Sequence, residues 1–268
     1  MLVKKTIMTM LMDHKVRPIR CFLLMGLMII FTQQLNAQIG EYRSELAIGG
    51  GGGYILSKVG FMPEVPQTQH EGLMAGLTVR YTSEKYFNSI CSVVGELNVA
   101  QVGWREEIQT PDDQPVINSV TGLPERYERT IHFLQLPVFA RLGWGRERKG
   151  FQAFVQAGPQ VGFLLGESTS SSFDFNTRNT AARTSKIVAQ DTMAVERKFE
   201  YGIAGGAGIE FSHRRLGHFI LEGRYYYGLG DLYGNSKRDY FGRSNLTNIV
   251  IKFTYLFDLK KTNNPQIK

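Results

Sequence analysis

The chain has 268 residues and a formal net charge of +7, from 31 Lys and Arg against 24 Asp and Glu. Residues 1–37 carry five of the basic and one of the acidic residues, which leaves 26 against 23, a net charge of +3, for the rest. That excess is small and forms no basic stripe with interleaved aromatic residues, so the sequence argues against a nucleic-acid partner. The low mean hydropathy excludes a bundle of transmembrane helices.

The first predicted element is a secretory signal peptide over residues 1–37. Basic residues precede an apolar run at 21–31, and the small residue Ala37 follows. This order is typical of a leader, with cleavage expected after Ala37. The alternative, a retained anchoring helix, would need about 20 apolar residues. We therefore expect residues 38–268 to form the exported domain, in which Cys91 has no second cysteine to pair with.

Alternating apolar and polar residues then indicate eight strands, at about 45–56, 71–81, 91–104, 129–142, 151–165, 199–211, 217–229 and 246–258. Each can supply the roughly 9–11 residues of a tilted transmembrane strand. Short links follow the even strands, and long polar links follow the odd ones, at 57–70, 105–128, 166–198 and 230–245. This phase is typical of outer-membrane barrels with short periplasmic turns and long outer loops. The pattern predicts an all-β fold, an eight-stranded antiparallel up-and-down transmembrane β-barrel.

The last of these segments shows the two faces most clearly. Ile249, Ile251, Phe253, Tyr255 and Phe257 share one face, which we expect to contact outer-membrane lipid. The same assignment in the other strands leaves eight charged residues on inward faces: Arg80, Glu96, Arg141, Glu200, Glu210, Glu222, Arg224 and Lys252. An eight-stranded barrel has an interior just wide enough for side chains, so these acids and bases are predicted to pair as a plug.

Other candidate sites are weaker. His213 and His218 bracket a short turn, where solvated side chains are a better interpretation than metal ligands. The glycine run at 49–53 lacks the ending of a phosphate-binding loop, so its expected role is to let a small barrel bend. His132 and the serines at 168–172 could meet at the outer rim as in a hydrolase, but their spacing does not require it. We expect no catalytic residue, metal or cofactor.

Two further features concern the backbone. Pro137 and Pro159 lie inside predicted strands and each removes a donor from the ladder, which predicts a bulge or kink. The segment 168–197 is rich in Ser, Thr, Asn and Ala and poor in large apolar residues. Such a composition predicts an outer loop that is mobile or that folds on a partner.

Several motifs resemble one known family. They are Asn36-Ala37-Gln38 at the end of the leader, the glycine-rich first strand, Gly95-Glu96-Leu97, Phe133-Leu134-Gln135-Leu136-Pro137-Val138, Phe154-Val155-Gln156-Ala157-Gly158-Pro159 and Phe253-Thr254-Tyr255-Leu256-Phe257. Over about residues 40–258 the chain resembles the PorT-like outer-membrane β-barrel proteins of the Bacteroidota. The resemblance implies a barrel but no activity: most members have no assigned function, and the eponym takes part in type IX secretion. Residues 259–268 continue past the terminal aromatic residue on which many barrels end.

The expected function is therefore that of a non-enzymatic outer-membrane barrel. Its long outer loops, chiefly 105–128 and 166–198, would contact a surface partner or a protein-secretion assembly. Two alternatives stay open, a membrane-embedded lipid-modifying enzyme and a narrow transport channel. The enzyme would need a nucleophile and a base at the lipid-facing rim, and the channel would need a hydrated lumen.

Overall fold

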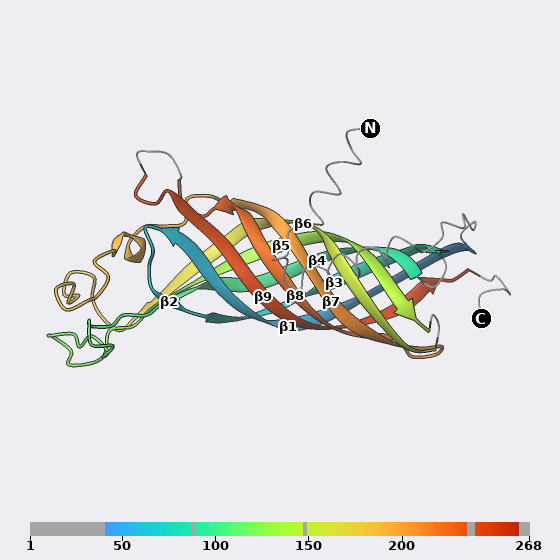
Figure 1. Ribbon diagram of the computed structural model, residues 1–268, viewed down its shortest axis with the longest axis horizontal. Coiled ribbons are helices and arrows are strands. Elements are labelled where there is room, and N and C mark those ends of the chain that lie inside the picture. The colour runs from blue at the N-terminus through green and yellow to red at the C-terminus, as the bar shows by residue number, and fades with distance from the viewer. Residues whose placement is uncertain (1–40, 87–88, 147–148, 235–238, 263–268) are drawn as a thin grey trace, which may run out of the picture. The chain divides into compact units, whose positions relative to one another are not determined.

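The computed structural model describes residues 41–86, 89–146, 149–234 and 239–262 (Figure 1). The predicted leader and its cleavage position after Ala37 lie outside these residues.

Long antiparallel strands wrap around a single closed ring (Figure 1). They are β1 (Glu41–Met62), β3 (His70–Tyr86), β4 (Ser89–Glu106), β5 (Tyr127–Gly145), β6 (Gly150–Ser171), β7 (Phe199–His213), β8 (Gly217–Asp231) and β9 (Arg243–Lys260). Neighbours in sequence pair with one another, and β1 also pairs with β9, which closes the ring. A two-residue strand, β2 (Gln67–Thr68), pairs with the end of β4. The predicted eight-stranded antiparallel up-and-down barrel is confirmed.

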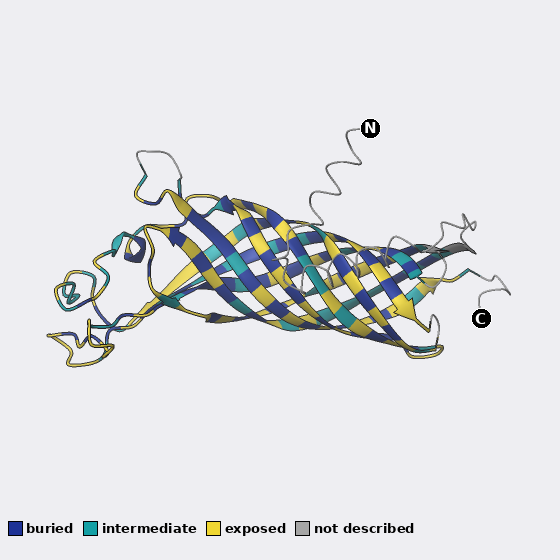
Figure 2. Cartoon of the chain, viewed as in Figure 1, coloured by how far each residue is buried: buried dark blue, intermediate teal, exposed yellow. Residues whose placement is uncertain are grey.

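Burial alternates along the strands as the sequence pattern predicts (Figure 2). Leu77 in β3, Ile209 in β7 and Phe253 in β9 are 59%, 52% and 51% exposed, whereas Glu210 and Lys252 beside them are almost fully buried. The exposed apolar residues come from every strand of the ring, so they form a continuous outward band. A band of this kind needs lipid to cover it.

The strands are longer than predicted, up to 22 residues in β1 and β6. Extra residues lie at both ends of the barrel; β3, for example, continues to Tyr86 at the end with the short turns. At the end that carries the long loops, β1 and β6 each run six residues past their predicted ends. There Arg105 of β4 pairs with Glu128 of β5, and Tyr127 of β5 pairs with Ser171 of β6. Apart from Met62 at the end of β1, the outward faces of the extensions at the long-loop end are polar, so the alternation that reveals a lipid-facing strand is absent. The hairpins therefore project past the apolar band.

The glycine run in β1 serves the curvature of the barrel. A Cβ atom on Gly49 would lie 1.8 Å from the Tyr255 carbonyl oxygen of β9, and one on Gly51 would lie 2.4 Å from the Phe253 carbonyl oxygen. The backbone of β9 thus occupies the space that a side chain would need. This close approach of two strands is what a sharply coiled sheet requires.

The prolines act differently from the prediction. The register between β5 and β6 is the same on both sides of Pro137 and Pro159, although two residue pairs are missing between them. The register shift in this pair of strands lies instead at His132–Phe133. The two prolines lie almost opposite each other, so both missing backbone N–H donors are at the same level of the β5–β6 ladder. The hydrogen bonds between the strands are therefore lost at that one level, and no extra residue is inserted into either strand.

Candidate functional site

A cluster of ion pairs fills the polar interior of the barrel. Arg224 donates from both terminal nitrogens to the Glu96 carboxylate, at 2.6 and 2.8 Å, and also contacts Glu222. The Lys252 Nζ lies 2.8 Å from Glu96 Oε2. These residues come from β4, β8 and β9, and each is at most 6% exposed. They meet because the inward positions of a narrow closed barrel share one interior.

A second group of charges joins the first. The Arg80 Nη1 lies 2.6 Å from Glu210 Oε2. Arg141 bridges the two groups, since its terminal nitrogens lie 3.6 Å from Glu210 and 3.5 Å from Glu222. Gln156 accepts a hydrogen bond from Arg141 at 2.9 Å and donates one to Glu222 at 2.8 Å. Seven of the eight luminal charges identified from the sequence therefore belong to one network.

Glu200 is the exception and departs from the prediction. It is 3% exposed, and its Oε1 accepts a hydrogen bond from the Tyr226 hydroxyl at 2.6 Å. In the described part of the chain no basic side chain pairs with it, and its Oε2 has no hydrogen-bond partner. Glu200 lies at the start of β7, toward the end that carries the long loops, beside the buried ring of Phe133. Alternation assigns a side chain to the lumen but not to a height within it.

Two residues that the sequence reasoning left out join the network at its other end. His218 Nδ1 lies 2.7 Å from Glu210 Oε1, and its Nε2 lies 3.0 Å from Asp258 Oδ1. The interpretation of His218 as a solvated turn residue is wrong, because it is 7% exposed. A signal was present: His218 has the same inward parity as Glu222, and Asp258 has that of Lys252.

Ser212, His218 and Asp258 contact one another in the Ser–His–Asp sequence of a hydrolase triad. The Ser212 Oγ lies 2.8 Å from His218 Nδ1, and His218 in turn contacts Asp258. Ser212 is completely buried, however, and its hydroxyl also lies 3.2 Å from Glu210 Oε1, where it can donate. A substrate therefore has no access to this hydroxyl. His132 makes no hydrogen bond to the serines at 168–172, all of which the structure describes.

The packing around the charges leaves little free space. The Arg141 guanidinium lies 3.8 Å from the centre of the Phe154 ring, and that of Arg224 lies 4.9 Å from the Phe139 ring. The cavity beside Arg80 and His218 has a volume of about 10 Å³, room for about one water molecule. Among the described residues, no three His, Cys, Asp or Glu side chains are grouped so that they could hold a metal ion.

The mouth of the barrel at the end that carries the long loops is closed by an aromatic cluster. Phe61 lies 5.3 Å from Trp104 and 4.8 Å from Phe241 between ring centres, and all three are at most 7% exposed. The Arg129 guanidinium lies 5.3 Å from the Trp104 ring and donates to the Tyr233 hydroxyl at 3.2 Å. Apolar packing thus covers the luminal charges on this side.

Above this mouth, the loops 107–126 and 172–198 fold onto each other. The Glu125 carboxylate accepts hydrogen bonds from Arg183 at 2.9 Å, Asn118 at 2.9 Å and the Asn179 backbone at 2.7 Å. Burial alone would raise the pKa of Glu125, but these donors outweigh burial and hold its pKa below the ordinary value. The segment 168–197 is therefore folded on its own chain. Its polar side chains supply the contacts that apolar ones would otherwise make.

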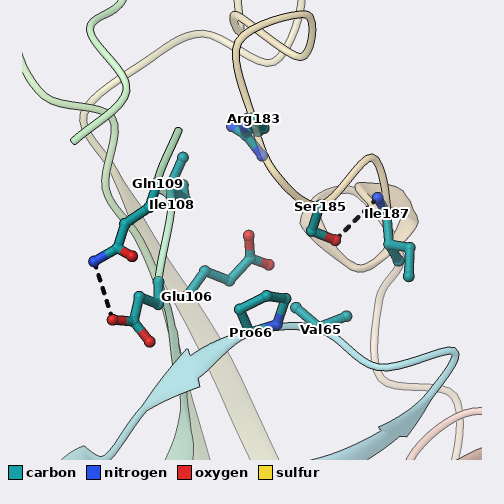
Figure 3. Close-up of a pocket in the computed structure, with 9 residues that line it drawn as sticks. Val65, Pro66, Glu106, Ile108, Gln109, Arg183, Ser185 and Ile187 are labelled. Atoms are coloured by element: carbon teal, nitrogen blue, oxygen red, sulfur yellow. Dashed lines mark hydrogen bonds between the residues drawn. The ribbon is translucent and has the colours of Figure 1, made fainter. Parts of the chain in front are cut away.

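A second contact holds the same loop to the end of β4. The Gln190 Nε2 donates to Glu106 Oε1 at 2.8 Å, and Arg178 Nη1 lies 3.1 Å from Asp191 Oδ2. Figure 3 shows the Glu106 carboxyl pointing into a small cavity between β4 and the loop that carries Arg183. Burial and the neighbouring Asp191 charge raise the pKa of Glu106 to about 8.

Comparison with known proteins identifies the family. A family model described as an outer membrane protein beta-barrel domain matches residues 31–234. The chain belongs to this family. Among solved structures it is similar to Yersinia pestis Ail in complex with the heparin analogue sucrose octasulfate (15% identity, 80% of this chain and 99% of that chain covered, TM-score 0.32). It is also similar to Pseudomonas aeruginosa OprG (13% identity, 81% and 98% covered, TM-score 0.34). No curated protein matches.

Family membership shows what surrounds the luminal ion-pair network and the cluster of contacts between loops 107–126 and 172–198. The protein is an outer-membrane β-barrel protein, and its outward apolar band contacts the lipid of that membrane. None of the helices in the described part of the chain is long and apolar enough to span a membrane. The luminal network therefore lies within the bilayer, and the loop cluster lies beyond the apolar band.

Proposed function

We propose that this protein is a non-enzymatic, PorT-like barrel of the Bacteroidota that contacts a surface protein or a protein-secretion assembly through its outer loops. In this proposal residues 1–37 are a leader removed after Ala37. The observation that carries the proposal is a contrast between two regions. The lumen is filled by paired charges, whereas the outer loops are folded and present apolar side chains to solvent.

The lumen supports a closed barrel. A conducting pore keeps its charged side chains hydrated, but here seven charges contact one another and are at most 7% exposed. Desolvated charges are stable only when they are paired and hydrogen-bonded. A transport channel would need a second conformation in which these contacts are broken.

The loop 107–126 supports contact with a partner. Ile117, Val120 and Leu123 are 48%, 72% and 59% exposed at its tip. The tip has a defined shape, because the Asn118 side-chain oxygen accepts the backbone N–H of Val120 at 3.0 Å and Gly122 has the left-handed φ of +66°. Exposed apolar side chains on a defined turn are typical of protein-contact sites.

Crosslinking in native membranes tests this proposal. We expect wild-type protein to be recovered with a discrete crosslinked partner, and the double variant Val120→Asp/Leu123→Asp to lose it. Leu216→Asp is the matched control, because Leu216 is also an exposed apolar turn residue, 56% exposed, but at the opposite end of the barrel. Equal recovery of the partner with both variants would refute contact through this loop. The mass of the mature chain tests removal of the leader.

A further inference from the structure

The contact between β4 and the loop 172–198 contains two buried carboxyl groups that face each other. Glu106 and Asp191 are 9% and 1% exposed. They are held next to each other, because Gln190 donates to Glu106 Oε1 at 2.8 Å, and Arg183, which lines the cavity of Glu106, lies 3.7 Å from Asp191 Oδ2. Asp191 Oδ1 is buried and has no hydrogen-bond partner among the described residues. Two ionised carboxylates buried side by side repel each other, whereas a carboxyl that keeps its proton can donate to such an oxygen.

The charges around the pair leave one negative charge in excess. Arg178 and Arg183 lie 3.1 and 3.7 Å from Asp191 Oδ2, and Arg183 is also held by Glu125 at 2.9 Å. The other titratable or charged groups that face the pair or line its cavity are Tyr127 and Arg129 of β5, Tyr233 beyond β8 and Glu107. Arg129 is itself paired with Glu167 at 3.4 Å. Three buried carboxyls thus face two guanidinium groups, and a single proton balances them.

We propose that Glu106 and Asp191 share one proton, and that this proton latches the loop 172–198 onto the outer end of β4. Loss of the proton leaves two carboxylates in contact and favours release of the loop. Release would uncover the aromatic mouth beneath, because Tyr127 and Arg129 now donate to the Asp191 backbone carbonyl at 3.1 and 3.2 Å.

The position of Glu106 places this latch outside the bilayer. The last exposed apolar residue on the outward face of β4 is Val99, after which the outward positions carry Gln101, Gly103 and Arg105. Glu106 is seven positions after Val99, about 20 Å along the strand. The latch is therefore in contact with the external medium and responds to its pH.

The direction of the pH effect follows from the raised pKa. In a released loop Glu106 titrates near its ordinary value of 4.5, whereas in the latched loop burial and the Asp191 charge raise its pKa to about 8. Between these values only the latched state holds the proton, so a rise in pH favours release. One proton corresponds to about a tenfold fall in the ratio of latched to released loop per pH unit. Above the upper value the ratio no longer changes.

Hydrogen exchange of backbone amides in residues 186–195 tests the latch in the full-length folded barrel. We expect their exchange, corrected for the intrinsic effect of pH, to rise about tenfold per unit between pH 6 and 8. Glu106→Gln keeps the shape and can still donate to Asp191, but it has no proton to lose. Its exchange should be slow and independent of pH.

The controls separate proton sharing from loss of structure. Glu125→Gln removes one of the three carboxylates and frees Arg183 for Asp191. Two guanidinium groups then balance the two remaining carboxyls without the proton, so we expect exchange in this variant to depend less on pH. Exchange within β7 should be equal in all variants. A pH dependence retained in Glu106→Gln, or absent from the wild type, would overturn the proposal. So would protection of the wild type by calcium chloride at pH 8.5, because a cation would then hold the pair.

Discussion

Replacement of Arg224 would disturb the luminal network at its centre. Its guanidinium makes two bonds to Glu96, contacts Glu222 and packs over the Phe139 ring. Arg224→Met keeps a long unbranched side chain but removes the charge. Glu96 would then have only Lys252 as an ion-pair partner, and Glu222 only Arg141.

The expected cost can be worked from these remaining contacts. Removing one partner of a buried ion pair destabilises a protein by about 3–5 kcal/mol, because the other charge stays buried. Each carboxylate here keeps one cation, so the lower value of about 3 kcal/mol applies. With a dependence on urea of about 2–3 kcal/mol per molar, the midpoint of unfolding should fall by about 1 M.

Urea titration of the purified barrel, followed by tryptophan fluorescence, measures this shift. Lys186→Ala is the control: the Lys186 ammonium is exposed and donates only to the backbone carbonyls of Thr180 and Ala181, at 2.9 and 2.7 Å. Its midpoint should not change. An unchanged midpoint for Arg224→Met, together with steady conductance in planar bilayers, would refute the plug and favour a channel.

Three further outcomes follow from the structure. Glu200→Gln should leave the urea midpoint unchanged or raise it, because a tyrosine hydroxyl is the only side-chain partner of this carboxyl among the described residues and the amide carries no charge to bury. A loss as large as that of the ion-pair variants would show that Glu200 belongs to the network. Gly51→Val should prevent folding of the barrel, measured by protease resistance, because its Cβ would lie 2.4 Å from a backbone oxygen of β9; normal resistance would contradict the close approach of the strands. In a Cys91→Ser background, a cysteine at Val120 should react with an impermeant thiol reagent on intact cells, and one at Lys149 should not; equal labelling would mean that the orientation is wrong.

The sequence alone determined the fold class, the number of strands and the two faces of each strand. These properties depend on a local pattern: side chains alternate with a period of two, and a lipid-facing strand must be apolar at every second position. The lengths of the links predict the orientation of the barrel in the membrane, which the cysteine labelling tests. The outer extensions of the strands could not be predicted in this way, because their outward faces are polar and the periodic signal ends with the apolar band.

Only the tertiary structure decided which charges meet. The alternation placed Glu200 and Glu210 alike in the lumen, but the stagger of the strands joins Glu210 to Arg80 and leaves Glu200 with Tyr226. The loop cluster was hidden for a related reason. Asp191 and Glu106 are 85 positions apart, and their contact depends on how two polar loops fold over one mouth, for which local composition carries no signal. The stagger between strands decided the contacts in the lumen, and the docking of one loop on another decided the contacts around Glu106 and Asp191. Neither is visible in the local sequence pattern.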